Sequence, residues 1–201
     1  MRRVHPWREI GDGVFVRRYR FYDQSIGAII GRERVAIIDT RTTHAQAREL
    51  RDDLRALTPL PVVVIDSHGH YDHAFGNSVF RPAPIWGHVR CPAFLLREGE
   101  LARARVSAEI PELAADLAEV VFDPPDRTFE TTASIDLGGR TIELRYLGRG
   151  HTDNDIVVIA PDAAVLFAGD LLENGATPSF GDSYPLEWPA TARALDRKSV
   201  V

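Results

Sequence analysis

Three of the chain's seven histidines fall within one short run, residues 68–73, which reads His-Gly-His-Tyr-Asp-His. In an extended loop alternate side chains point to the same side, so His68 and His70 can reach one metal ion, with metal–nitrogen distances of about 2.0–2.1 Å for zinc. Asp72 and His73 follow at the turn into the next segment, where they can face a second ion, or Asp72 can hold a metal-bound water. The run predicts a metal site, because a free solvated loop has no reason to collect these side chains.

Two imidazoles do not complete a metal shell, so further donors must come from elsewhere in the chain. His151 is one candidate, because it follows a predicted strand and a glycine, and Asp170 is another, because it ends an apolar strand beside a glycine. Glycine lets other groups approach closely at such a position. Taken alone, each residue is typical of an ordinary loop or turn, so its assignment to the site depends on the histidine run.

The elements that must position these residues are mostly short. Residues 62–65 are β-branched, as is typical of a buried strand, and they lead into the histidine run. Thr43 is placed to cap a helix that Pro59 and Pro61 end. Further strands are expected over 14–21, 26–30, 35–39, 83–86, 134–137, 141–147, 156–160 and 164–168, and further helices over 93–101 and 108–120. This order predicts two sheets with helices packed outside them.

Composition narrows the class of protein. The 201 residues are 44% hydrophobic and 26% charged, which fits one globular domain over 1–201. The net charge of −5 predicts no general attraction to nucleic acid or membrane, and no apolar run approaches the roughly 18 residues of a membrane span. The start lacks the apolar stretch of a signal peptide, so we expect a cytoplasmic protein with a small-molecule substrate and leave its oligomeric state open. The lone cysteine, Cys91, excludes a disulfide framework and a multi-cysteine zinc site.

Four features follow one another along the chain: a strand ending in Asp39, the run 68–73, a Gly-His pair at His151 and a Gly-Asp pair at Asp170. This order resembles the metallo-β-lactamase superfamily of metal-dependent hydrolases. The resemblance implies an α/β (α+β) protein, a four-layer αββα sandwich with a metal site at one edge of its two sheets. It also implies the ligands: His68, His70 and His151 for a first ion, Asp72 and His73 for a second, and Asp170 bridging both. By the same resemblance Asp39 is a structural residue that supports the site loops.

Two departures from the family pattern concern one loop and the end of the chain. Residues 152–155 read Thr-Asp-Asn-Asp where many members have Thr-Pro-Gly-Ser, which leaves the substrate class open. Asp153 and Asp155 are expected to cap this loop and not to touch a metal. The family has a further histidine ligand on a later strand, and residues 171–201 contain no histidine. Together with the lone lysine, Lys198, this predicts a chain that lacks the last strand and helix and binds its second ion weakly.

The function that these features favour is a zinc-dependent hydrolase with one or two ions per chain, with iron and manganese as other candidate metals. A metal-activated water would attack an ester, thioester, lactone or amide bond, with Asp72 orienting the water. One alternative is a mononuclear iron dioxygenase that acts on sulfur compounds through His68, His151 and Asp170. Another is a truncated metal-binding protein with little activity. Metal analysis separates the first two, since iron with oxygen uptake favours the dioxygenase.

Overall fold

Two β-sheets form the centre of the molecule within residues 7–175 and 177–196, which the computed structural model describes. The first sheet has seven strands in the order β1-β2-β3-β4-β5-β6-β7, and the second has four in the order β11-β10-β9-β8. The first sheet contains β1 (Arg8–Gly11), β2 (Val14–Arg18), β3 (Ser25–Ile30), β4 (Val35–Ile38), β5 (Val62–Ile65), β6 (Ile85–His88) and β7 (Arg127–Phe129). The second contains β8 (Thr132–Asp136), β9 (Thr141–Tyr146), β10 (Ile156–Ala160) and β11 (Val165–Phe167).

The helices are of unequal length. The α-helices are α1 (His44–Leu57), α2 (Tyr71–Ala74), α3 (Cys91–Glu109), α4 (Ala114–Ala118) and α5 (Trp188–Asp196). The 3-10 helices are η1 (Phe21–Asp23), η2 (Asn77–Phe80), η3 (Pro111–Leu113), η4 (Pro161–Ala163) and η5 (Gly169–Leu171). Thr43 caps α1 as expected, because its side chain accepts a hydrogen bond from the backbone N–H of Gln46.

The two sheets pack face to face through a shared apolar core. The residues that meet there are buried: Val14, Ile38 and Ile65 from the first sheet, and Ile142 and Val158 from the second. Burial of each such side chain is worth about 1.5–3 kcal/mol. This core therefore stabilises the position of one sheet against the other, and with it the position of the loops along their common edge.

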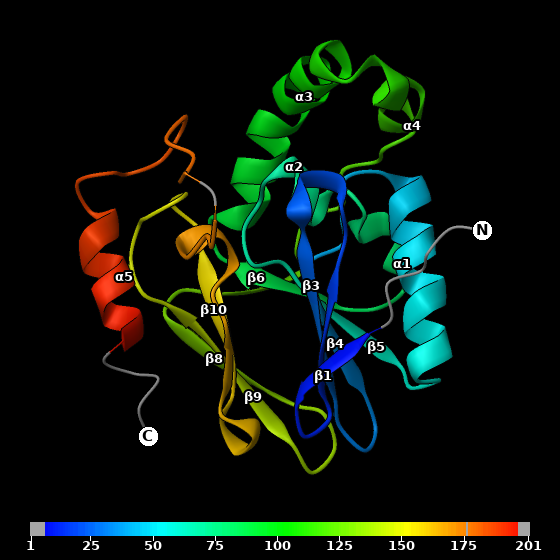
Figure 1. Ribbon diagram of the computed structural model, residues 1–201, viewed down its shortest axis with the longest axis vertical. Coiled ribbons are helices and arrows are strands. Elements are labelled where there is room, and N and C mark those ends of the chain that lie inside the picture. The colour runs from blue at the N-terminus through cyan, green and yellow to red at the C-terminus, as the bar shows by residue number, and fades with distance from the viewer. Residues whose placement is uncertain (1–6, 176, 197–201) are drawn as a thin grey trace.

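Helices cover the outer faces of both sheets, and Figure 1 shows α1 and α5 on opposite sides of the sandwich. Leu50 and Leu54 of α1 belong to a buried cluster with Val64 of the first sheet, while Trp188 of α5 packs with Val157 of the second. The α/β class and the αββα layering expected from the sequence are confirmed. Helices α3 and α4 lie across one end of the sandwich (Figure 1).

The parallel half of the first sheet brings two strand ends together at this covered end. β4 pairs with β5 in parallel, and Ile38 lies opposite Ile65. Asp39, which follows β4, and the histidine run, which follows β5, therefore leave the sheet at the same edge. The second sheet meets them there, because the backbone N–H of Ile156 at the start of β10 donates to the carbonyl of Ser67 at 2.8 Å.

The expected helices over 93–101 and 108–120 are wrong in their boundaries. The structure has one continuous helix, α3, through residues 102–107, and only the short η3 and α4 after it. Residues 102–107 alternate alanine and arginine before Val106, and such helix formers give the chain no reason to stop. The break comes at Pro111, which lacks the N–H that a continuing helix needs.

The segment around Lys198, on which the expectation of a shortened chain depends, lies outside the described residues. Among the helices of residues 7–175 and 177–196, none combines the length and the apolar character that a membrane span requires.

Candidate metal centre

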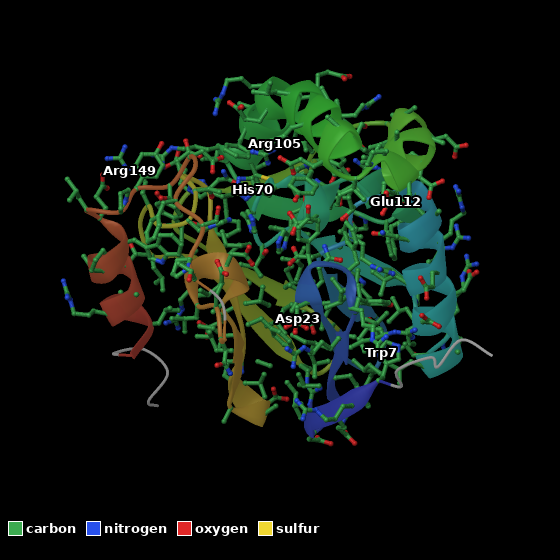
Figure 2. The ribbon with its side chains drawn as sticks, turned by 45° about the horizontal axis from the view of Figure 1, so that its top comes forward. Trp7, Asp23, His70, Arg105, Glu112 and Arg149 are labelled. Atoms are coloured by element: carbon green, nitrogen blue, oxygen red, sulfur yellow. The ribbon has the colours of Figure 1, made fainter. Side chains whose placement is uncertain are left out.

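The six predicted ligands come from both sheets and lie at the end of the sandwich that α3 covers. The loop after β5 carries His68 and His70, α2 carries Asp72 and His73, the loop between β9 and β10 carries His151, and η5 carries Asp170. Figure 2 shows His70 at this end, next to α3. The ring of His70 also contacts the ring of Phe94 on α3, with 5.3 Å between the centroids.

Three imidazole nitrogens converge at the first of two positions. His70 Nδ1 lies 3.0 Å from His68 Nε2 and 2.9 Å from His151 Nε2. Nitrogen ligands of a tetrahedral zinc ion are about 3.3 Å apart, given zinc–nitrogen distances of about 2.0–2.1 Å. The two measured distances are close to this spacing, and all three nitrogens lie within 4.8 Å of one another, so they can share one ion.

The protonation of these rings fits a cation between them. Burial lowers the pKa of His68 well below its usual range, and burial, with nearby His70, lowers the pKa of His151 to about 4. Both rings are therefore neutral at pH 7, which is the form that binds metal. His70 Nδ1 can accept an N–H from His68 or from His151, but not from both, so one of its two contacts would lack a hydrogen bond. A cation between the rings would instead accept the lone pairs of all three nitrogens.

A second position lies around His73 and the two carboxylates beside it. His73 Nε2 is 3.4 Å from Asp72 Oδ2 and 3.5 Å from Asp170 Oδ2. Asp170 Oδ2 is also 3.5 Å from His151 Nε2, so this oxygen stands between the two positions. Burial alone would raise the pKa of Asp170, but nearby His73 and His151 hold it well below its usual range. The same balance of burial against His73 lowers the pKa of Asp72, so both groups are carboxylates at pH 7.

Asp39 supports the site from behind the histidine run. Its Oδ1 accepts a hydrogen bond from the backbone N–H of Ser67 at 2.7 Å, and its Oδ2 accepts one from the Ser67 hydroxyl at 2.9 Å. Asp39 Oδ2 also lies 2.9 Å from His73 Nδ1, which leaves Nε2 of that ring to face Asp72 and Asp170. A carboxylate in this place fixes both the ring orientation and the tautomer of a metal-binding histidine.

The loop after His151 is held by its own side chains. Asp155 accepts hydrogen bonds from the backbone N–H and the hydroxyl of Thr152, at 2.8 and 2.7 Å, so it caps the loop as expected. The side-chain oxygen of Asn154 accepts the backbone N–H of Gly69 at 2.9 Å, which ties this loop to the histidine run. A Cβ at Gly69 would lie only 2.8 Å from the Phe94 ring, so the glycine lets the run pass beneath α3.

Two acidic residues at the site had no signal in the sequence. Asp182 Oδ2 lies 2.9 Å from His70 Nε2, although 112 residues separate the two in the chain. Glu173 has a carboxylate oxygen that lies within 4.8 Å of a donor nitrogen of His151 and a donor oxygen of Asp170. Both belong to the segment between η5 and α5, where no strand or helix pattern marks a position.

The contact of Asp182 with His70 makes a measurable prediction. A carboxylate that accepts the outer N–H of a metal-binding histidine orients the ring and raises its basicity, and its loss typically costs about 10- to 100-fold in metal affinity. We expect this loss for Asp182→Ala, measured as zinc affinity in competition with a chromophoric chelator. Asp162→Ala is a suitable control, since Asp162 is an exposed carboxylate paired with Arg140. Parental affinity in Asp182→Ala would show that His70 needs no such support.

A cavity of about 420 Å³ opens beside the second position. Its lining includes Asp72, His73, Asp170 and Glu173, together with the segment 22–25. Ligand pockets of proteins commonly have volumes of about 300–1,000 Å³. A small molecule can therefore approach the carboxylates and His73 from this side.

Comparisons with known proteins agree on one family. The profile of the metallo-beta-lactamase superfamily matches residues 19–200. A type 2 metallo-beta-lactamase from Bacteroides fragilis is 32% identical over 100 residues, covering 49% of this chain and 40% of that protein. An acyl-coenzyme A thioesterase from Gallus gallus is 25% identical over 189 residues, covering 84% of this chain and 66% of that protein. The chain thus spans less than two thirds of the length of either relative.

The fold itself has counterparts among solved structures. A metallo-beta-lactamase from Pontibacter korlensis superposes with a TM-score of 0.74 at 20% identity, over 96% of this chain and 85% of that one. At this identity the likeness establishes the fold alone, and the chemistry has to be argued from the residues of the site.

Proposed function

The chain belongs to the metallo-beta-lactamase superfamily, and from this premise we propose that it is a metal-dependent hydrolase that uses zinc and a metal-activated water to cleave an acyl bond. The observation that carries the proposal is the convergence of three ring nitrogens, with His70 Nδ1 at 3.0 Å from His68 and 2.9 Å from His151. In the proposed site these residues would hold the first ion and Asp72 and His73 would hold a second, with Asp170 placed between the two positions.

The metal and the side chains have different roles in the proposed hydrolysis. When bound, zinc lowers the pKa of a water ligand to about 7 and polarises a substrate carbonyl. Asp72, a carboxylate at pH 7, accepts the proton of the attacking water and passes it to the leaving group. Asp39 holds His73 through Nδ1, and Asp182 holds His70 through Nε2, so both rings keep their orientation while the proton moves.

The relatives support an acyl substrate. One is named as a beta-lactamase and another as an acyl-coenzyme A thioesterase, and both names denote hydrolysis of a bond to a carbonyl carbon. We therefore place esters, thioesters, lactones and amides as the substrate class of this chain. The cavity of about 420 Å³ beside Asp72 would admit such a small molecule.

The dioxygenase alternative has less geometric support. It requires His68, His151 and Asp170 to bind one iron ion. Within the described part of the chain, the donor atoms that lie within 4.8 Å of one another form three groups of three, and this trio is not one of them. The ligands proposed for the hydrolase's first ion, His68, His70 and His151, do form one of these groups, and on that ground the acyl hydrolase is the better-supported proposal.

Elemental analysis of the purified chain beside a substrate panel tests the proposal. We expect zinc in the protein, hydrolysis of at least one ester, thioester, lactone or beta-lactam, loss of that activity on chelation and its return on addition of zinc. Iron accompanied by oxygen uptake on a thiol substrate, with no hydrolysis across the panel, would overturn it.

A further inference from the structure

The loop between β2 and β3 brings a buried glutamine to the helix that carries Asp72. Gln24 is the last residue of this loop and is only 6% exposed. Its side-chain Nε2 donates a hydrogen bond to the backbone carbonyl of Asp72 at 2.5 Å, although 48 residues separate the two in the chain. Figure 1 shows the end of the β2–β3 hairpin next to α2. The antiparallel half of the first sheet is thus linked directly to the proposed base.

The carbonyl of Asp72 lacks the partner that a longer helix would give it. In a continuing α-helix it would accept the N–H of Gly76, four residues further on. Because α2 has only four residues, that N–H donates instead to the carbonyl of Arg41, at 3.1 Å. Carbonyls at a helix end need donors from elsewhere, and side chains are one source. Gln24 is the side chain that supplies the donor here.

The backbone of the loop just before Gln24 is strained. Tyr22 and Asp23 both have left-handed backbone angles, with φ of 49° and 53°. This conformation is unfavourable for a bulky residue such as tyrosine, and strain of this kind collects at functional sites, where surrounding contacts maintain it. The ion pair of Asp23 with Arg18 and the hydrogen bond of Gln24 to α2 are such contacts. The loop is therefore held in the conformation that turns Gln24 towards α2.

The rest of the Gln24 side chain offers nothing to a substrate. Gln24 borders the cavity of about 420 Å³, but its Oε1 is buried and has no hydrogen-bond partner among the described residues. An unpaired buried acceptor destabilises the folded state, and a methionine would fill the same space without one. Packing alone therefore does not account for a glutamine at this position. The contact that an apolar residue could not make is the one to the Asp72 carbonyl.

We propose that Gln24 is a positioning residue for the hydrolysis, because its hydrogen bond to the Asp72 carbonyl fixes α2 and with it the direction of the Asp72 carboxylate. This inference rests on the proposed function, in which Asp72 accepts the proton of the attacking water. The carbonyl and the carboxylate belong to one residue, so a movement of the backbone at Asp72 displaces both. A misplacement of about 1 Å in a reacting group can cost about 100-fold in rate. The contact should therefore affect kcat more than KM.

Gln24→Met tests the inference, since methionine has about the same length and no N–H donor. On an ester, thioester, lactone or beta-lactam that the parent hydrolyses, and at saturating zinc, we expect kcat to fall by about 10- to 100-fold and KM to stay within about twofold. Gln24→Leu, a second variant without a donor, should behave alike.

Hydrogen exchange of the metal-free protein gives a readout that needs neither substrate nor metal. The amide protons of Ala74 and Phe75 bond to the carbonyls of His70 and Tyr71 at the start of α2. Without the Gln24 donor these two protons should exchange about 2- to 10-fold faster than in the parent, which corresponds to the net loss of one hydrogen bond.

Gln46→Met is the matched control. Gln46 is the other glutamine of the chain and is half-buried on α1, where its Oε1 accepts the backbone N–H of Thr42 at 3.3 Å. This variant also loses a hydrogen bond between a glutamine side chain and the backbone, but it should keep parental kcat and parental exchange of α2. Parental kcat in Gln24→Met, an equal fall of kcat in Gln46→Met, or parental exchange of α2 in Gln24→Met would each overturn the inference. A parent without hydrolytic activity would instead contradict the proposed function, and the exchange of α2 would still decide whether Gln24 holds Asp72.

Discussion

Replacing His151 by alanine should remove the first metal ion and abolish hydrolysis. His151 is the nitrogen donor of the first position that comes from the second sheet, 81 residues from His70 in the chain. Without it, His68 and His70 remain as two donors on one loop, which is too few for a tetrahedral shell. Since loss of an outer partner alone costs about 10- to 100-fold in affinity, loss of a ligand should cost at least about 100-fold. Elemental analysis after dialysis measures the effect.

The fold of the variant must be checked separately, because His151 is buried and its ring lies 5.6 Å from that of Trp188. Thermal melts of the metal-free parent and metal-free variant provide this check. His44→Ala is the control: His44 is half-buried on α1, where it contacts Ser78, and the variant should keep parental metal content. If His151→Ala keeps that content too, the ligand assignment is wrong.

The sequence predicts the parts of the site that depend on local order. A β-branched strand followed by alternating histidines marks the loop after β5, because both features lie within about a dozen residues. Asp39 was expected beside that loop only through the family resemblance, and the structure explains its place by the parallel pairing of β4 with β5, which puts both strand ends at one edge. These contacts follow from strand order and from the periodicity of side chains.

Other parts of the site depend on the course of the irregular segment between η5 and α5, which no local sequence pattern describes. Asp182 and Glu173 lie in an irregular segment, and their approach to His70 and Asp170 is set by how that segment crosses the end of the sandwich. The helix boundaries failed for a different reason. The helix formers of 102–107 and the break at Pro111 are local signals for one continuous α3, and the predicted boundaries did not use them.

The two sheets contribute differently to the proposed chemistry. The segment that follows β5 of the first sheet, the loop together with α2, supplies four of the six proposed ligands, and the second sheet supplies His151 and Asp170. Asp170 Oδ2 lies 3.5 Å from both His151 and His73, so it joins the two contributions. The site therefore exists only when the sheets are packed, and metal binding should stabilise the folded chain against unfolding.

Asp72→Asn should leave metal bound and remove most of the activity. Asp72 lies in the first turn of α2, and nearby His73 helps to keep its pKa low against the effect of burial, so its side chain is a carboxylate at pH 7. Asparagine has the same size but cannot accept the proton of the attacking water. Loss of a general base typically costs about 10²- to 10⁴-fold in rate, and we expect a fall in kcat of this order.

Asp116→Asn separates this effect from a change in helix stability, because Asp116 also lies in the first turn of a short helix, α4, away from the proposed ligands. Charge removal at that position should leave kcat and metal content at parental values. In Asp72→Asn, the three nitrogens of the first position are intact, so at least one metal should remain after dialysis while kcat falls. Parental turnover with metal retained would assign the proton transfer to another group. Loss of both ions would show that Asp72 acts mainly as a metal ligand and not as the base.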